Sequence, residues 1–144
     1  MEAILGEMAG HLIRRLHQQS AQVFQRRMEE AGIDLTPVQF ATMQALKSDP
    51  GIEQAQVAAM IAYDRATIGG VIDRLEQKGY VSRVVSKRDR RAREVRLTDE
   101  GLRVFAAVSP VVVSLQEAIL GDLSGPERAQ FLTLARKALG QDGD

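Results

Sequence analysis

The stretch DRATIGGVIDRLEQKGYVSRVVSKRDRRAREVRLTDEG, from Asp64 to Gly101, decides the fold of this chain. Aliphatic residues recur in its first part at helical spacing, at Ile68, Val71, Ile72 and Leu75. Asp64 is a good N-cap for this helix, and Gly79 is the glycine expected after its last turn. Two β-branched runs follow, Tyr80–Lys87 and Glu94–Leu97, on either side of an arginine-rich turn, which predicts a two-stranded hairpin.

A second helix is expected directly before this stretch. The segment from about Glu53 to Ile61 is short and rich in alanine, and a tight turn is expected around Ala62-Tyr63. Two helices joined in this way form a helix-turn-helix, whose second helix can enter the major groove of DNA. The outward positions at the start and along that helix are the candidate DNA-binding residues: Arg65, Ala66, Thr67, Gly69, Gly70 and Arg74.

The adjacent glycines Gly69 and Gly70 are unusual inside a helix, since each costs about 1 kcal/mol relative to alanine. Close approach of the helix backbone to the edge of a groove would explain why they are tolerated. The alternative is crowding between helices within the domain. For Gly69 the two explanations stand even, whereas Gly70 favours DNA.

The turn of the hairpin is strongly cationic. Ser86–Arg93 contains five Lys and Arg in eight positions, and Arg88, Arg90 and Arg91 are candidate contacts to the DNA backbone. Residues 64–96 hold ten Lys and Arg against five Asp and Glu, a net +5, and the remainder of this neutral chain carries −5. Charge alone also fits a solvated hairpin, but a helix-turn-helix directly before it favours double-stranded DNA.

Helices are expected on both sides of this region. Their starts are marked by the capping boxes Thr36-Pro37-Val38-Gln39 and Ser124-Gly125-Pro126-Glu127 and by Thr98. Residues from about Ala3 to Ala31 keep a helical period of apolar positions. The chain therefore reads as a mainly α fold with a small β-hairpin, without an internal repeat or a linker.

Several motifs within the opening stretch resemble the MarR family of bacterial regulators. They are Asp73-Arg74-Leu75, Gly79, Arg83, Asp89-Arg90-Arg91 and Leu97-Thr98-Asp99-Glu100-Gly101. The flanking helices agree with that family in number and order, so the resemblance covers essentially the whole chain. It implies a winged helix-turn-helix core at about 36–98 and dimerisation helices at about 3–31 and 99–140, in a single domain 1–144.

The resemblance also implies how DNA is bound. Recognition helices of a triangular dimer enter successive major grooves, and wing arginines enter the flanking minor grooves. Arg91 corresponds to the wing-tip arginine, and Asp89 to the acid that stabilises the wing by pairing with a nearby arginine. Many members carry Thr or Ser and then Arg where this chain has Gly69 and Gly70, which leaves base reading to Arg65, Thr67 and Arg74.

A homodimer is expected from the terminal helices as well. Their faces are more apolar than one small domain needs, at Ile4, Leu5, Met8, Leu12, Val111, Val112, Leu115, Ile119, Leu120, Leu123, Phe131, Leu134 and Leu139. A two-fold partner would cover these faces and match a pseudo-palindromic operator. The alternative is that they pack on each other within one chain.

A small ligand is suggested by the segment His11–Gln18, HLIRRLHQ. It resembles members that control aromatic-acid catabolism, in which the ligand lies between the first helix, the dimer helices and the winged domain. His11 and Arg15 share a helix face, and with Arg14 and His17 they are candidate contacts to a benzoate-, cinnamate- or nicotinate-like acid that weakens DNA binding. The alternative is a surface cluster or a polar dimer seam.

Other functions find little support in the sequence. There is no Cys, no Gly-x-Ser-x-Gly, no phosphate-binding glycine loop and no His/acid cluster at metal spacing, so we expect no enzyme, catalytic residue, metal or cofactor. The N-terminus does not read as a secretion signal, and the best apolar run, Val104–Leu123, is interrupted by Pro110, Gln116 and Glu117. We therefore expect a cytoplasmic repressor without membrane contact. The alternative is a winged-helix protein-interaction module that does not bind DNA.

Overall fold

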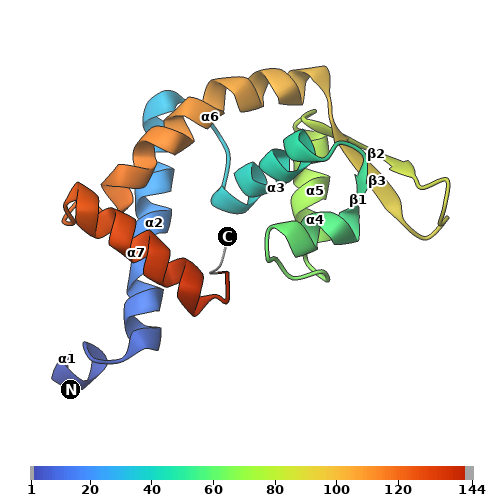
Figure 1. Ribbon diagram of the computed structural model, residues 1–144. Coiled ribbons are helices and arrows are strands. Elements are labelled where there is room, and N and C mark those ends of the chain that lie inside the picture. Colours follow the sequence, from blue (N-terminus) through green and yellow to red (C-terminus); the bar gives the residue numbers. More distant parts are fainter. Residues whose placement is uncertain (1, 142–144) are drawn as a thin grey trace. The chain divides into compact units, whose positions relative to one another are not determined.

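The computed structural model describes the backbone of residues 2–141 and the side chains of residues 4–141. Its elements, drawn in Figure 1, are α1 (Glu2–Leu5), α2 (Ala9–Ala31), α3 (Pro37–Ser48), β1 (Ile52–Glu53), α4 (Gln54–Met60), α5 (Ile68–Gln77), β2 (Val81–Val85), β3 (Arg93–Leu97), α6 (Asp99–Ile119) and α7 (Gly125–Ala138). The expected mainly α fold with a small hairpin is confirmed.

The chain forms two compact units. The central unit is Phe24–Val113, and the terminal unit combines Met1–Val23 with Ser114–Asp144. Helices α2 and α6 each contribute residues to both units. The central unit contains α3, α4, α5 and all three strands, and therefore the whole helix-turn-helix.

The sheet of the central unit is antiparallel, with the strand order β1-β3-β2. Strands β2 and β3 form the expected hairpin, in which Arg83 lies opposite Val95, and Figure 1 shows this hairpin and its loop projecting from the helices of the unit. Strand β1 was not expected, because Ile52 and Glu53 were assigned to a loop and to the start of a helix. Two residues are too few to show a β period, and they become a strand only by pairing with β3.

An aliphatic core supports the second helix of the helix-turn-helix. The four positions expected to face inward on α5, Ile68, Val71, Ile72 and Leu75, are all buried. They share the core with Met43, Leu46, Val57, Val95 and Val108. The rings of Phe40 and Phe105 stack at a centroid distance of 5.4 Å, which joins α3 to the first half of α6. The face of α5 opposite this core is left to solvent.

The start of α5 differs from the expected one. Asp64 Oδ1 accepts a hydrogen bond from the Ala66 amide at 3.1 Å, and the Asp64 carbonyl accepts from the amides of Thr67 and Ile68. These bonds hold residues 64–67 in a turn, and the regular helix begins only at Ile68. Arg65, Ala66 and Thr67 thus lie in the turn that leads into α5, because the Asp side chain bonds to the local backbone in a non-helical conformation.

The end of α5 is as expected. Gly79 has φ +83°, its amide donates to the Glu76 carbonyl, and the amide of Tyr80 donates to the Leu75 carbonyl. This pair of bonds is a Schellman motif, which needs a residue in the left-handed region after the helix. The capping boxes expected at Thr36 and Ser124 are present too, and hydrogen bonds from Ser124 lower the pKa of Glu127.

Three expectations about the outer helices were wrong. The single helix expected over residues 3–31 is interrupted between Leu5 and Ala9, where Gly6 lies, because glycine is a poor helix former. Helix α6 is long and apolar enough, by length and composition, to cross a membrane, with a mean hydropathy of 1.5, although its apolar run was expected to be too interrupted for this. Its buried residues Phe105, Val108, Val112 and Leu115 form one stripe at helical spacing, the pattern of a helix packed against protein along one side. The expectation that Val112 and Leu115 need a partner subunit was therefore wrong, because both are covered within the chain.

The junction between α5 and α6 is closed by three hydrogen bonds and one close approach. The Thr98 hydroxyl donates to the Gly79 carbonyl and accepts from the Gly101 amide at 3.0 Å, and the Thr98 amide donates to the Tyr80 carbonyl at 3.0 Å. A Cβ on Gly101 would lie 2.0 Å from the Tyr80 carbonyl oxygen. This contact is too short for any side chain, so the junction requires glycine at position 101.

Substituting Gly101→Ala should therefore lower the free energy of unfolding by about 1–3 kcal/mol, because the methyl group forces the two backbones apart. Urea denaturation followed by circular dichroism measures the change. Gly10→Ala in α2 is the matched control, since no described atom beyond its chain neighbours and the nearby helix backbone lies within 4 Å of that Cβ position. The stability of this variant should be unchanged or slightly higher. Equal effects of the two substitutions would contradict this account of the junction.

Candidate nucleic-acid interface

The turn between α4 and α5 sets the angle of the helix-turn-helix. The Tyr63 amide donates to the Ala58 carbonyl at 2.9 Å, and Ala62 adopts φ +55°, in the left-handed region that residues with a side chain seldom enter. The turn lies where the sequence predicted it. Because the turn is compact, α5 can pack on α4 while the outer face of α5 stays open.

The predicted DNA-binding residues of the helix-turn-helix are all exposed except Gly69, which is half-buried. Arg65, Ala66 and Thr67 are exposed in the turn before α5, and Gly70 and Arg74 are exposed on α5 itself. The Thr67 hydroxyl donates to the Asp64 carbonyl at 3.2 Å, so its proton is engaged locally. Its methyl group and lone pairs remain available to an incoming partner. Arg65 and Arg74 have the longest side chains on this surface, and their guanidinium groups can donate hydrogen bonds to a partner.

The two glycines of α5 differ in their surroundings. Apart from its chain neighbours and the nearby backbone of α5, no described atom lies within 4 Å of the place where a Cβ on Gly70 would be, so crowding between helices does not explain this glycine. A Cβ on Gly69 would meet only the side-chain nitrogen of Gln54, at 3.1 Å. That atom is the end of a flexible side chain and could move. Packing within the central unit therefore does not require glycine at either position.

The wing, defined here as β2, β3 and the loop Ser86–Ala92, is ordered by its own polar groups. Ser86 is 3% exposed, and its hydroxyl accepts from the amides of Arg88 and Asp89 at 3.2 and 3.4 Å. Asp89 Oδ1 accepts from the Arg91 amide at 3.0 Å and lies 3.4 Å from Arg91 Nε. Asp89 thus contacts the arginine that the resemblance singled out. Arg88, Arg90 and Arg91 are exposed around this loop.

Sequence reasoning did not identify the role of Ser86. A serine at the end of a strand, two and three residues before the amides it bonds, is the signal of a hydroxyl-capped turn. Cation density drew attention to the arginines instead. The consequence is that the wing loop depends on a neutral, buried side chain as well as on Asp89.

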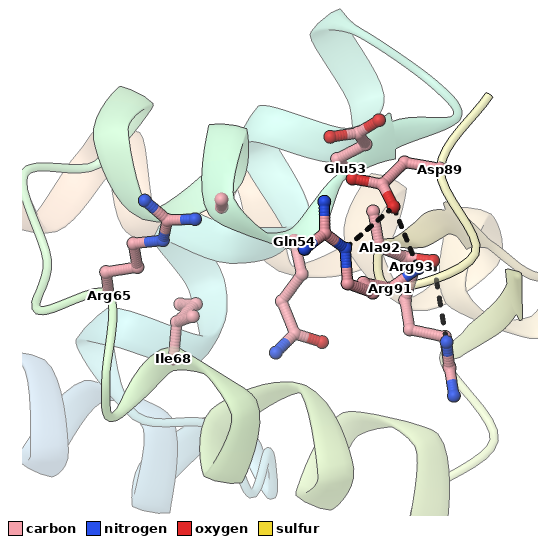
Figure 2. A pocket seen from close by; sticks show the side chains of 9 residues that line it. Glu53, Gln54, Arg65, Ile68, Asp89, Arg91, Ala92 and Arg93 are labelled. Carbon is pink, nitrogen blue, oxygen red and sulfur yellow. Dashed lines mark hydrogen bonds and ion pairs between the residues drawn. The ribbon is translucent and has the colours of Figure 1, made fainter. Parts of the chain in front are cut away.

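A cavity of about 500 Å³ separates the start of α5 from the wing. Its polar lining consists of Glu53, Gln54, Arg65, Asp89, Arg91 and Arg93. Figure 2 shows Arg65 on one side of this hollow and Asp89, Arg91 and Arg93 on the other. Two predicted DNA-binding arginines, one from each element, therefore border the same space. This arrangement can hold an anionic strand between two cationic walls.

The candidate ligand residues lie on α2, and a second cavity, of about 520 Å³, involves part of them. It lies within the terminal unit and is lined by Leu5, Gly6, His11, Leu12, Arg15, Leu16 and Gln19. Arg14 is outside the lining but lies 3.2 Å from His11 Nδ1 through its guanidinium, and His17 is also outside. Among the side chains of residues 4–141, no group of three His, Cys, Asp or Glu is arranged to hold a metal ion.

Comparison with known proteins gives consistent matches. The profile of the MarR family matches residues 35–92. The transcriptional regulator HosA of Escherichia coli O111:H- is 37% identical over 94% of this chain and 97% of its own. The structure of Bordetella bronchiseptica BpsR, whose DNA binding is regulated by 6-hydroxynicotinic acid, has a TM-score of 0.84, 30% identity and 96% coverage of both chains. The transcriptional repressor CouR bound to a 23-mer DNA duplex has a TM-score of 0.80, 27% identity and 94% coverage of both chains.

The glycine of α5 with open space around it allows a clear test. Gly70→Ala should raise the free energy of unfolding by up to about 1 kcal/mol, because alanine is the better helix former. The same methyl group should weaken binding of a specific duplex by about tenfold, since it keeps the helix backbone away from the groove. Chemical denaturation and fluorescence anisotropy measure the two effects on the same protein. Tighter or unchanged DNA binding would show that no close approach occurs at Gly70.

Proposed function

Since this chain belongs to the MarR family of transcriptional regulators, we propose that it binds double-stranded DNA as a homodimer and represses transcription until a small aromatic acid releases it. The observation that carries the proposal is the pair of cationic walls, Arg65 before α5 and Arg91 on the wing, on either side of one hollow. Neither wall alone distinguishes a DNA-binding surface from an ordinary charged face.

In this proposal α5 enters the major groove of each half-site. Arg65, Thr67 and Arg74 contact base edges, while Ala66, Gly69 and Gly70 allow the helix to approach them closely. The exposed wing arginines Arg88, Arg90 and Arg91 bind phosphates and the adjacent minor groove, and Asp89 orients Arg91. The net +5 of residues 64–96 attracts the duplex although the whole chain is neutral.

The terminal helices supply the dimer interface. All α7 side chains belong to the described part of the chain, and none of them is buried. Large apolar side chains of the terminal unit are exposed, namely Ile4, Leu5, Met8, Leu12, Ile13, Leu132, Leu134 and Leu139. Apolar surface of this extent on one unit supports burial against a second copy. In the proposed domain, residues 36–98 read DNA and residues 3–31 and 99–140 form the dimer on a pseudo-palindromic operator.

The effector is proposed from the cavity of the terminal unit. Arg15 and His11 supply a cation and an imidazole, and Leu5, Leu12 and Leu16 supply an aliphatic wall, a combination that suits an aromatic carboxylate. Arg14 would act through His11, which it contacts. His17 lies outside the cavity and is the weakest of the four candidate ligand contacts. The regulation of BpsR by 6-hydroxynicotinic acid supports the same chemical class.

The proposal includes no catalysis and no cofactor, because a regulator of this kind acts through binding alone. It also assigns the protein to the cytoplasm, since a bacterial regulator must reach the chromosome. The competing function is a winged-helix module that contacts another protein through the same surface. The surface charge and the paired arginines favour DNA.

Reversing the charge of the wing arginine tests DNA binding. Arg91→Glu should weaken binding of a duplex from upstream of its own gene by tenfold or more at low salt, because it replaces a phosphate contact with repulsion. The slope of log affinity against log salt should fall by about 1. Arg26→Glu, an exposed residue of α2, makes the same change in net charge and should leave binding nearly unaffected. An unchanged gel shift for Arg91→Glu would favour the protein-contact alternative.

Titration with acids tests the effector. Benzoate, cinnamate or a hydroxynicotinate should weaken the DNA complex by roughly 5- to 150-fold, the usual range of coupling between two sites. Arg15→Met should abolish this response, because the carboxylate loses its cation, whereas Arg26→Met, a cation of the same helix outside the cavity, should keep it. If no acid of this class changes DNA binding, the effector part of the proposal fails and the DNA part stands.

A further inference from the structure

We propose that Arg83 is a positioning residue of the DNA-binding surface, which fixes α5 relative to the wing and to α4 without itself contacting DNA. This inference rests on the proposed function. It concerns a residue that the sequence marked only as part of a motif, and it assigns a purpose to two acids, Asp73 and Glu76, on a helix expected to meet phosphates.

Arg83 joins three elements through one guanidinium. It lies on β2, and its Nη2 donates to Asp73 Oδ1 and, at 2.9 Å, to Glu76 Oε1, both on α5. Its Nη1 donates to Gln54 Oε1 on α4 at 3.3 Å. The planar guanidinium of arginine directs several donors at once in fixed directions, which the single ammonium of lysine cannot do. One side chain therefore holds the wing strand and both helices of the helix-turn-helix.

The network is partly shielded from water. The Arg83 side chain is 20% exposed, whereas the carboxylates of Asp73 and Glu76 are 53% and 43% exposed. Hydrogen bonding to Glu76, reinforced by Asp73, raises the pKa of the Arg83 guanidinium despite the opposing effect of partial burial. A pair with one shielded partner and more than one hydrogen bond restricts geometry more than an exposed single contact does.

The same network reaches the reading surface. Gln54 lines the hollow between Arg65 and Arg91, and its side-chain nitrogen lies 3.1 Å from the place of a Cβ on Gly69. Asp73 directly precedes Arg74, one of the proposed base-reading residues. Loss of the network would thus let α5 and the wing shift relative to each other, and a shift of about 1 Å is enough to disturb a site whose contacts are this specific.

Electrostatics and positioning predict opposite signs for the two acids. If Asp73 and Glu76 act on DNA only through their charge, removing that charge should strengthen every duplex complex, because phosphate repulsion is lost. If the two acids act by holding Arg83, removing their charge should weaken the complex with the specific duplex, while the complex with unrelated DNA becomes tighter. This difference in sign separates the two roles.

The experiment begins with a duplex that the wild-type protein selects from a randomised library. Dissociation constants for this duplex and for an unrelated duplex of equal length are then measured at two salt concentrations. Failure of the wild type to enrich any sequence would overturn the proposed function, and this inference with it. Enrichment followed by unaltered binding of the variants below would overturn only the inference.

Arg83→Lys is the first variant, and it keeps the charge while losing the planar fork. Its affinity for the selected duplex should fall at least tenfold, with affinity for the unrelated duplex and its salt dependence within twofold of the wild type. A parallel loss of both affinities, together with a lower free energy of unfolding, would mean a merely structural role and overturn the proposal. So would unchanged binding of the selected duplex.

The double variant Asp73→Asn with Glu76→Gln is the second test. It should bind the selected duplex more weakly and the unrelated duplex more tightly. Glu94→Gln is the matched control, since it removes an acid from β3 whose side chain lies on the opposite face of the sheet from Arg83, and it should tighten both complexes slightly. If the double variant also tightens both complexes, the two acids act through charge alone and the proposal is wrong.

Discussion

The contact between Gly101 and the Tyr80 carbonyl is the constraint on which the DNA-binding surface depends. It fixes the start of α6 against the end of α5, and Thr98 adds hydrogen bonds to Gly79, Tyr80 and Gly101. Because β2 and β3 lie between these two helices in the chain, closing the junction also fixes both ends of the wing. Backbone packing therefore fixes both ends of the wing, and the loop arginines Arg88, Arg90 and Arg91 need only supply charge.

Charge is distributed over this scaffold so that cations remain available where a duplex would lie. Asp89 and Ser86 bond to the backbone of the wing loop and leave the guanidinium groups around it exposed. Asp73 and Glu76, by contrast, bond to Arg83, which removes one cation from the surface and joins α5 to β2. A neutral chain can in this way bind an anionic polymer, because the geometry of its ion pairs decides which charges are free.

Release by an effector requires that a change in the terminal unit alter the central unit. Helix α2, which carries His11 and Arg15 beside the cavity, continues without interruption from the terminal unit into the central unit. A ligand that fits this cavity differently in the DNA-bound and free states would shift the equilibrium between them by its difference in affinity.

Local chemistry was enough for the sequence to determine much of this protein. Capping boxes at Thr36 and Ser124, the glycine after α5, the inward aliphatic positions of α5 and the cationic hairpin all follow from bonds or periods within a few residues. Other features needed tertiary structure: β1 is a strand only beside β3, and Arg83 finds its partners on two other elements. Periodicity in a sequence reveals which nearby residues share a face of a helix or strand. The contacts named here join residues 7 to 43 positions apart, and no periodic pattern predicts them.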